Sequence, residues 1–203
     1  HSNIVNAYFV EVIDNQPYLF MEYIKGINRE KTSLREWLKS DGPFSTDQAI
    51  TFAYQLCLGM EFANKKGEIA HLDLKPENIL INQDTILKVT DFGLAQRVRI
   101  VEGQYSRSDF GTWPYAAPER FAGKVEDSRS DIYAFGVILY EMLTGKLPYP
   151  FHLSKEPETQ FKQLFTFYAD PRNLKFHEGI YYGGIPEVDD YGAPSAPSFF
   201  VSG

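Results

Sequence analysis

Three short polar motifs in the middle of the chain constrain its fold more strongly than any other feature of the sequence. Residues 71–78 read HLDLKPEN, residues 91–93 read DFG, and residues 117–119 read APE. Each motif alone is short enough to occur in unrelated proteins, but their order and spacing together leave little room for coincidence. Residues 91–119 lack periodicity and predict a long ordered loop, which in a compact domain is usually functional.

This set of motifs resembles the catalytic loop, the magnesium loop and the activation-segment anchor of protein kinases. The resemblance covers roughly residues 1–180. Lys75 and the Gly-Thr pair before Tyr115 are similar to serine/threonine kinases rather than tyrosine kinases. The resemblance implies an α+β, protein-kinase-like fold, with a mostly helical C-terminal lobe and a remnant of the small-lobe sheet. It also implies a transferase that moves a phosphoryl group from ATP to Ser or Thr of a protein substrate, with Mg²⁺ as cofactor.

The resemblance also implies roles for the polar residues of the motifs. Asp73 would accept the proton of the substrate hydroxyl, and Lys75 would steady the transferring phosphate as a point charge. Asn78 and Asp91 carry hard oxygen atoms and would hold magnesium between the phosphates. Thr112 would hydrogen-bond Asp73 and Lys75; the alternative is an ordinary turn threonine. Isolated acids are usually turn or surface residues, but the complete set favours the catalytic interpretation.

Residues 18–24 resemble the last strand of the small lobe as it runs into the hinge of a kinase. Adenine would hydrogen-bond the backbone C=O of Glu22 and the backbone N–H of Ile24. Met21 would be the gatekeeper residue, and Leu80 would form the apolar floor beneath the base. An apolar strand that ends in Glu is common elsewhere, so only its place before the HLDLKPEN motif favours the hinge.

The chain departs from the kinase pattern in three ways. No G-x-G-x-x-G phosphate loop occurs in the 203 residues, and the strand lysine and its partner glutamate are missing. We therefore expect a truncated kinase that transfers no phosphate alone. Leu72 stands where most kinases have an arginine that pairs with a phosphorylated activation loop. No downstream arginine is a convincing partner for Glu119, because Arg172 comes too early, so we expect an unpaired and destabilising acid if this carboxylate is buried.

We expect three parts: small-lobe strands in residues 1–24, an incomplete C-terminal lobe in residues 25–182, and a tail in residues 183–203, whose composition favours disorder. The motif wording of the first half resembles bacterial kinases more than animal ones. The competing hypothesis is a pseudokinase or a non-catalytic docking module, which Leu72 favours. Against it, Asp73 and the other polar motif residues are all present.

Composition narrows the partners and the location. The net charge of −7 argues against nucleic acid as the main partner, and no apolar run is long enough for a membrane span. The single cysteine, Cys57, cannot form an internal disulfide, which favours a reducing cytoplasm. Because Cys57 lies in an apolar helical stretch, we expect it to fill the core.

Periodicity and turn signals place the regular elements. Ser45 and Gln48 form a predicted capping box at the start of a long helix that runs to residue 63. Asp131 is the predicted cap of an apolar helix over residues 132–143, which Gly145 ends; its apolar residues on every face predict a central place in the lobe. The other predicted elements are strands at 6–13 and 18–24 with a turn at 14–17, a hairpin of 78–81 with 86–89, and helices at 33–39 and 158–168.

Overall fold

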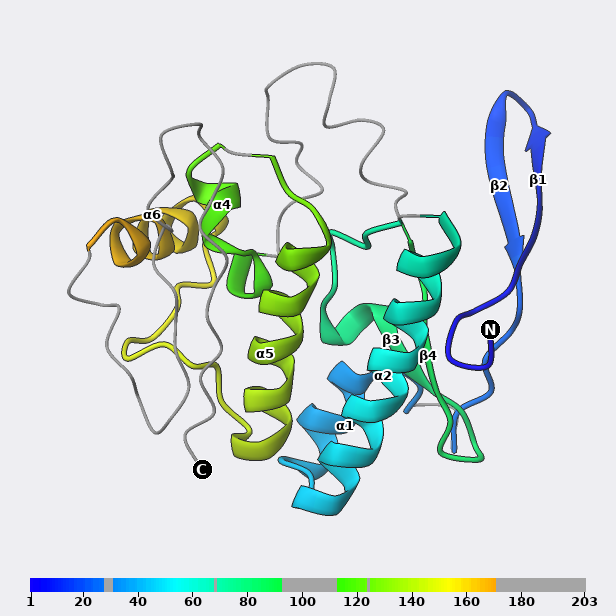
Figure 1. Ribbon diagram of the computed structural model, residues 1–203, viewed down its shortest axis with the longest axis horizontal. Helices are drawn as coiled ribbons and strands as arrows, with labels where there is room; N and C mark the ends of the chain where they lie inside the picture. The colour runs from blue at the N-terminus through cyan, green and yellow to red at the C-terminus, as the bar shows by residue number, and fades with distance from the viewer. Residues whose placement is uncertain (28–30, 68, 93–112, 124, 171–203) are drawn as a thin grey trace.

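Helices are the main regular element in the described part of the chain. The computed structural model describes residues 1–27, 31–67, 69–92, 113–123 and 125–170 (Figure 1). Helices α1 (Leu34–Asp41), α2 (Thr46–Gly67) and α5 (Ser128–Thr144) pack around one apolar core. Within the described residues, two small antiparallel sheets accompany them, and the β1–β2 hairpin stands at one end of the molecule. This confirms the predicted α+β fold, a mostly helical lobe with a remnant of a sheet.

The β1–β2 hairpin is formed by strands β1 (Ala7–Ile13) and β2 (Gln16–Met21). The turn is tighter than predicted, because only Asp14 and Asn15 lie outside the strands, with φ of 49° and 61°. Asp and Asn tolerate this left-handed backbone better than most residues. The second strand therefore begins two residues before the predicted start and ends at Met21, ahead of the predicted end. All seven β1 residues are exposed.

Helices α1 and α2 each begin with a capping box. Ser33 caps α1 and exchanges hydrogen bonds with Glu36, and Ser45 does the same with Gln48 at the start of α2, as predicted. α2 extends to Gly67. Its buried face differs from the prediction, because Cys57 is exposed rather than in the core. Ile50 of α2 is also exposed. The buried α2 residues are Ala49, Phe52, Ala53, Leu56, Gly59 and Ala63.

The long helix α5 starts earlier than predicted. Asp127 is its N-cap, and the Asp127 side chain accepts the backbone N–H of Arg129. Asp131 therefore lies in the first turn, where its side chain is buried and serves another segment. The predicted stop is confirmed, since Gly145 has a left-handed backbone with φ of 70°. The helix contributes Ala134, Val137, Ile138 and Met142 to the main core, in agreement with the predicted central place, although Ile132 is 50% exposed.

The remaining elements position the motifs. Strands β3 (Ile79–Ile81) and β4 (Leu87–Val89) form the predicted hairpin. Helix α6 (Pro157–Ala169) confirms the predicted amphipathic helix and packs with α4 (Pro118–Phe121) in a second apolar cluster. Short helices at η3 (Trp113–Tyr115) and α4 replace the end of the predicted loop. The rest of that loop, residues 93–112, and the predicted tail lie outside the described residues.

The described residues contain no helix that combines the length and the apolar character required to cross a membrane.

Candidate active site

Buried polar groups of other segments fix the HLDLKPEN loop (residues 71–78). The carboxylate of Asp131 accepts the backbone N–H of His71 and the backbone N–H of Leu72, each at 2.7 Å. Burial raises the pKa of Asp131, and these two hydrogen bonds act in the opposite direction. Leu72 has a left-handed backbone with φ of 59°, which is costly for a leucine. Arg120 of α4 donates to the Leu72 carbonyl oxygen. Both the N–H and the C=O of this strained residue are therefore hydrogen-bonded to side chains of other segments.

Two side chains of the loop, those of Lys75 and Asn78, contact Asp73. The Nζ atom of Lys75 lies 2.8 Å from Asp73 Oδ2. The side-chain nitrogen of Asn78 donates to the Asp73 carbonyl oxygen at 2.9 Å and lies 3.4 Å from Oδ2. The other carboxylate oxygen, Oδ1, is buried and has no hydrogen-bond partner among the described residues. Since a buried oxygen without a donor is costly, this atom is suited to accept a hydrogen bond from a bound hydroxyl.

His71 joins the DFG segment to this loop. Its Nε2 atom lies 2.8 Å from the Thr90 carbonyl oxygen, and its ring packs on Phe92 with the centroids 4.8 Å apart. Asp91, between these two contacts, is exposed and has φ of 62°. The backbone N–H of Thr90 also donates to the Asn78 carbonyl oxygen at 3.0 Å. The two predicted magnesium ligands, Asn78 and Asp91, therefore lie on segments that are hydrogen-bonded to each other.

The predicted adenine-binding segment lies against the β3–β4 hairpin. A Glu22 carboxylate oxygen lies 2.9 Å from Lys88 Nζ of β4, and the other accepts the Asn6 backbone N–H at 3.2 Å. Burial raises the pKa of Glu22, but Lys88 and the Asn6 N–H outweigh it, and the net shift is downward. Lys88 is the cross-strand partner of Leu80. The Glu22 side chain thus connects the segment to the strand pair that carries Leu80.

Of the remaining predicted residues, Met21 and Ile24 lie in the described part of the chain. The Met21 sulfur accepts the Thr90 hydroxyl at 3.9 Å, so the end of β2 reaches the residue before Asp91. Ile24 is buried, with 7% of its surface exposed. Thr112 lies outside the described residues. The structure therefore brings Asp73 into direct contact with two predicted partners, and it connects the DFG and hinge segments to the same region.

Comparisons with known proteins identify the family. The protein kinase domain family matches residues 1–180, and a probable serine/threonine-protein kinase of Clostridium acetobutylicum is 40% identical over 149 residues, which are 73% of this chain. The chain belongs to the serine/threonine protein kinase family. PknB of Lactococcus lactis and PrkC of Bacillus subtilis are each 35% identical over 149 residues. The kinase chain spans 22%, 23% and 22% of the lengths of these three relatives.

Glu119, the acid of the APE motif, corrects one expectation about this kinase chain. The sequence predicts an unpaired and destabilising acid if this carboxylate is buried, but Glu119 is only half-buried and its Oε1 atom accepts the Ser130 hydroxyl at 2.5 Å. The condition of burial is therefore not met, and the first turn of α5 supplies a neutral hydrogen-bond donor that the sequence did not indicate. Two neighbouring residues of one helical turn thus bind two different motifs of the kinase. Ser130 binds the APE motif, and Asp131 binds the HLDLKPEN loop.

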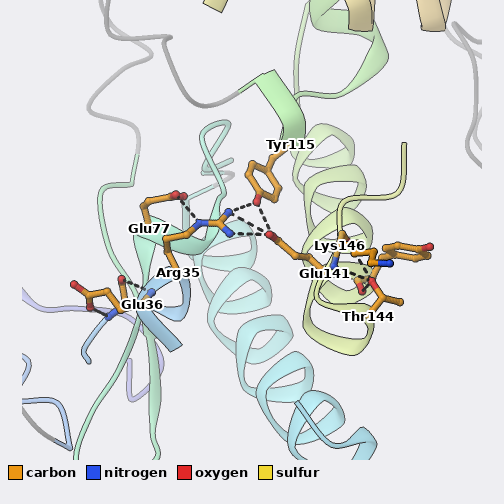
Figure 2. A network of polar contacts seen from close by, with 9 residues as sticks. Arg35, Glu36, Glu77, Tyr115, Glu141, Thr144 and Lys146 are labelled. Atoms are coloured by element: carbon orange, nitrogen blue, oxygen red, sulfur yellow. Dashed lines mark hydrogen bonds and ion pairs between the residues drawn. The ribbon is translucent and has the colours of Figure 1, made fainter. Parts of the chain in front are cut away.

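Sequence reasoning missed a four-residue cluster around Arg35, which Figure 2 shows. The guanidinium of Arg35 contacts Glu77 of the HLDLKPEN loop, Tyr115 of η3 and Glu141 of α5. One signal in the sequence could have found it. With helical spacing, Glu141 falls on the same face of α5 as Val137 and Ile138, and a charge on a buried face needs a partner.

Proposed function

We propose that this chain supplies the catalytic carboxylate of an ATP-dependent kinase that phosphorylates Ser or Thr of protein substrates. The environment of Asp73 is the observation that carries the proposal. Lys75 binds one oxygen of its carboxylate at 2.8 Å, and the second oxygen is buried without a donor among the described residues. A substrate hydroxyl would supply the missing donor. Asp73 would then orient this hydroxyl and accept its proton.

In the proposed reaction, the substrate oxygen forms a bond to the γ-phosphorus of ATP, and the bond from that phosphorus to the β–γ bridging oxygen breaks. ADP leaves, and the substrate proton passes to Asp73. Lys75 would hold the transferred phosphoryl group, which gathers negative charge as the bonds change. Its position at Asp73 places a cation beside the group that takes the proton.

Asn78 and Asp91 would hold the magnesium ion of this reaction. One amide oxygen and one carboxylate are a small donor set, and Mg²⁺ is usually bound by one or two carboxylates together with substrate phosphates and water. The side-chain nitrogen of Asn78 already donates to Asp73, so the side-chain oxygen remains as the metal ligand. When bound, magnesium neutralises the charge of the phosphates. We include the hinge residues Glu22 and Ile24, with Met21 and Leu80, in the same proposal as the adenine site.

The test is phosphoryl transfer by the full-length protein that contains these residues, because the chain spans about a fifth of its relatives. Labelled ATP, Mg²⁺ and a Ser/Thr-containing basic protein are incubated with it, and phosphoamino acid analysis identifies the acceptor. We expect phosphoserine or phosphothreonine. Asp73→Asn should remove the signal, whereas Asp84→Asn, in the exposed β3–β4 turn, should retain it.

A signal that survives Asp73→Asn would overturn the proposal, and no transfer by the full-length protein would favour the pseudokinase alternative. A cytoplasmic location belongs to the same proposal, since the one cysteine of the chain is a free thiol.

A further inference from the structure

Arg35 lies at the centre of a polar cluster and has no role in the proposed reaction. Its Nε atom donates to Glu77 Oε1 at 2.8 Å, and Nη1 donates to Glu141 Oε1 at 2.7 Å. Nη2 contacts the Tyr115 hydroxyl, which itself donates to Glu141 Oε2 at 2.6 Å. Figure 2 shows the guanidinium between the three partners. A planar guanidinium can bind several oxygens in fixed directions, which a lysine ammonium cannot do.

Three of the four side chains of the cluster are largely protected from water, whereas the Glu77 side chain is 46% exposed. Tyr115 is 3% exposed, and the side chains of Glu141 and Arg35 are 8% and 19% exposed. Burial and the neighbouring Glu141 raise the pKa of Tyr115, so its hydroxyl keeps its proton. Burial lowers the pKa of Arg35, but Tyr115 and Glu141 outweigh this effect and raise it. Such charge-assisted contacts are stronger and more directional than those of exposed ion pairs.

The partners of Arg35 flank the proposed reacting group. Glu77 comes directly before Asn78 in the HLDLKPEN loop, and Tyr115 belongs to η3, the first described turn after residue 112. Tyr115 and Asp73 also line one small cavity, together with Leu72, Ala116, Ala117 and Arg120. Arg35 itself belongs to neither segment, because it lies in α1.

From this juxtaposition we propose that Arg35 is a positioning residue for phosphoryl transfer. It holds the segment at Tyr115 in register with the loop that carries Asp73, with Glu141 of α5 as the fixed support. The inference rests on the proposed function. Phosphoryl transfer requires the acceptor to be in line with the phosphate, and a misplacement of about 1 Å can cost on the order of 100-fold in rate.

The test separates positioning from stability. Arg35→Met alone leaves Glu141 as a buried carboxylate without its cation, so the main variant is Arg35→Met with Glu141→Gln, which keeps the net charge of the cluster unchanged. In the full-length protein, we expect kcat for the protein acceptor to fall about 10- to 100-fold, with KM for ATP within about twofold. Lys31→Met is the matched control, because Lys31 pairs with Asp41 beside α1 and does not touch the loop. Its kcat should not change.

A second measurement needs no turnover. In a Trp37→Phe background of the 203-residue chain, Trp113 is the only tryptophan, and it is 5% exposed. We expect its emission to shift to longer wavelength and its quenching by acrylamide to rise in the Arg35→Met/Glu141→Gln variant, but not in Lys31→Met. Unchanged kcat in an active protein, or unchanged Trp113 emission and quenching, would overturn the inference. If the unmodified protein transfers no phosphate, the proposed function fails, and the Trp113 measurement alone decides whether Arg35 positions this segment.

Discussion

The HLDLKPEN loop and the β1–β2 hairpin are held in opposite ways. Asp131 and Arg120 hold the loop through buried contacts to its backbone, and His71 joins it to the DFG segment. The hairpin has strand-to-strand hydrogen bonds, but every residue of β1 is exposed. Its end is joined to the lobe by the Glu22–Lys88 ion pair at 2.9 Å. Buried contacts within the lobe therefore hold the HLDLKPEN loop, whereas the hairpin gains little stability from burial. Substitutions in the two regions should have different effects on stability.

The largest expected effect separates two carboxylates of the reactive region. Asp73→Asn in the full-length protein should lower turnover by roughly 1,000-fold and change nucleotide affinity only a few-fold, because in the proposed reaction this carboxylate would act on the acceptor hydroxyl. Asp91→Asn should also weaken magnesium-dependent nucleotide binding. Initial rates and nucleotide titrations with and without Mg²⁺ measure both. Equal and small losses of rate and affinity in the two variants would contradict this division of roles.

A second prediction compares the stability of the two regions. Asp131→Ala removes the acceptor of two buried N–H groups, and each unsatisfied group costs about 1–3 kcal/mol. We therefore expect the free energy of unfolding of the 203-residue chain to fall by roughly 2–6 kcal/mol. Val12→Ala in β1, where Val12 is 65% exposed, should change it by less than about 0.5 kcal/mol. Urea unfolding measures both. Similar losses in the two variants would show that the hairpin is as firmly held as the loop.

Local patterns predicted the elements whose signals lie within a few residues. Sequence alone located the start of α2 and the end of α5. The signals are local, since a capping box of Ser45 and Gln48 marks the first and Gly145 marks the second. The hairpin around residues 82–85 was located by its turn signal. The kinase motifs likewise predicted that Asp73, Lys75 and Asn78 lie together, because all three belong to one short loop.

Contacts between distant segments were not predictable in this way. Asp131 is the last acid before the apolar run, so it resembled a helix cap, but three polar residues before it are also helical and Asp127 takes the cap. The segments that pack on α2 determine which of its faces is buried. That face includes Leu56 but not its neighbour Cys57, which is exposed. Helical spacing can indicate that Glu141 needs a partner, but a single sequence does not indicate that Arg35, 106 positions away, is that partner.

Because other segments of the lobe hold the HLDLKPEN loop, we expect phosphorylation to have a smaller effect on turnover than these substitutions. Leu72 is 6% exposed, and its carbonyl oxygen is bound by Arg120, which also pairs with Glu126 at 2.7 Å. A loop that the lobe already holds needs no phosphate to order it, and Leu72 has no charge to bind one. Phosphatase treatment of the full-length protein should therefore change kcat less than about threefold, or ~0.7 kcal/mol.

Mass spectrometry should confirm that the phosphate is lost from Ser106, Ser108 and Thr112 before kcat is compared. A loss of tenfold or more would refute this expectation. Arg97, Arg99 and Arg107, which lie outside the described residues, would then be the next candidates for mutation.

The smallest expected effect lies next to Arg35, at Glu36. Arg35 points into the polar cluster, whereas Glu36 is exposed and accepts the backbone N–H groups of Ser33 at 2.7 Å and Thr32 at 2.8 Å. These hydrogen bonds, first that of Ser33, lower the pKa of Glu36. Because the folded-state pKa is the lower one, the contribution of this carboxylate to stability is complete above its ordinary pKa of about 4.3 and is lost as pH falls through the lowered pKa.

Glu36→Gln should therefore reduce the free energy of unfolding at pH 7 by less than about 1 kcal/mol, and the difference from the unmodified chain should shrink below pH ~4. Urea unfolding of the 203-residue chain at both pH values measures this. Ser33→Ala is the matched partner variant, since Ser33 and Glu36 share one capping box and their effects should not be additive. A pH-independent loss of several kcal/mol would mean that the start of α1 carries stability through Glu36. The contrast between an exposed cap and the buried Arg35 cluster beside it would then be wrong.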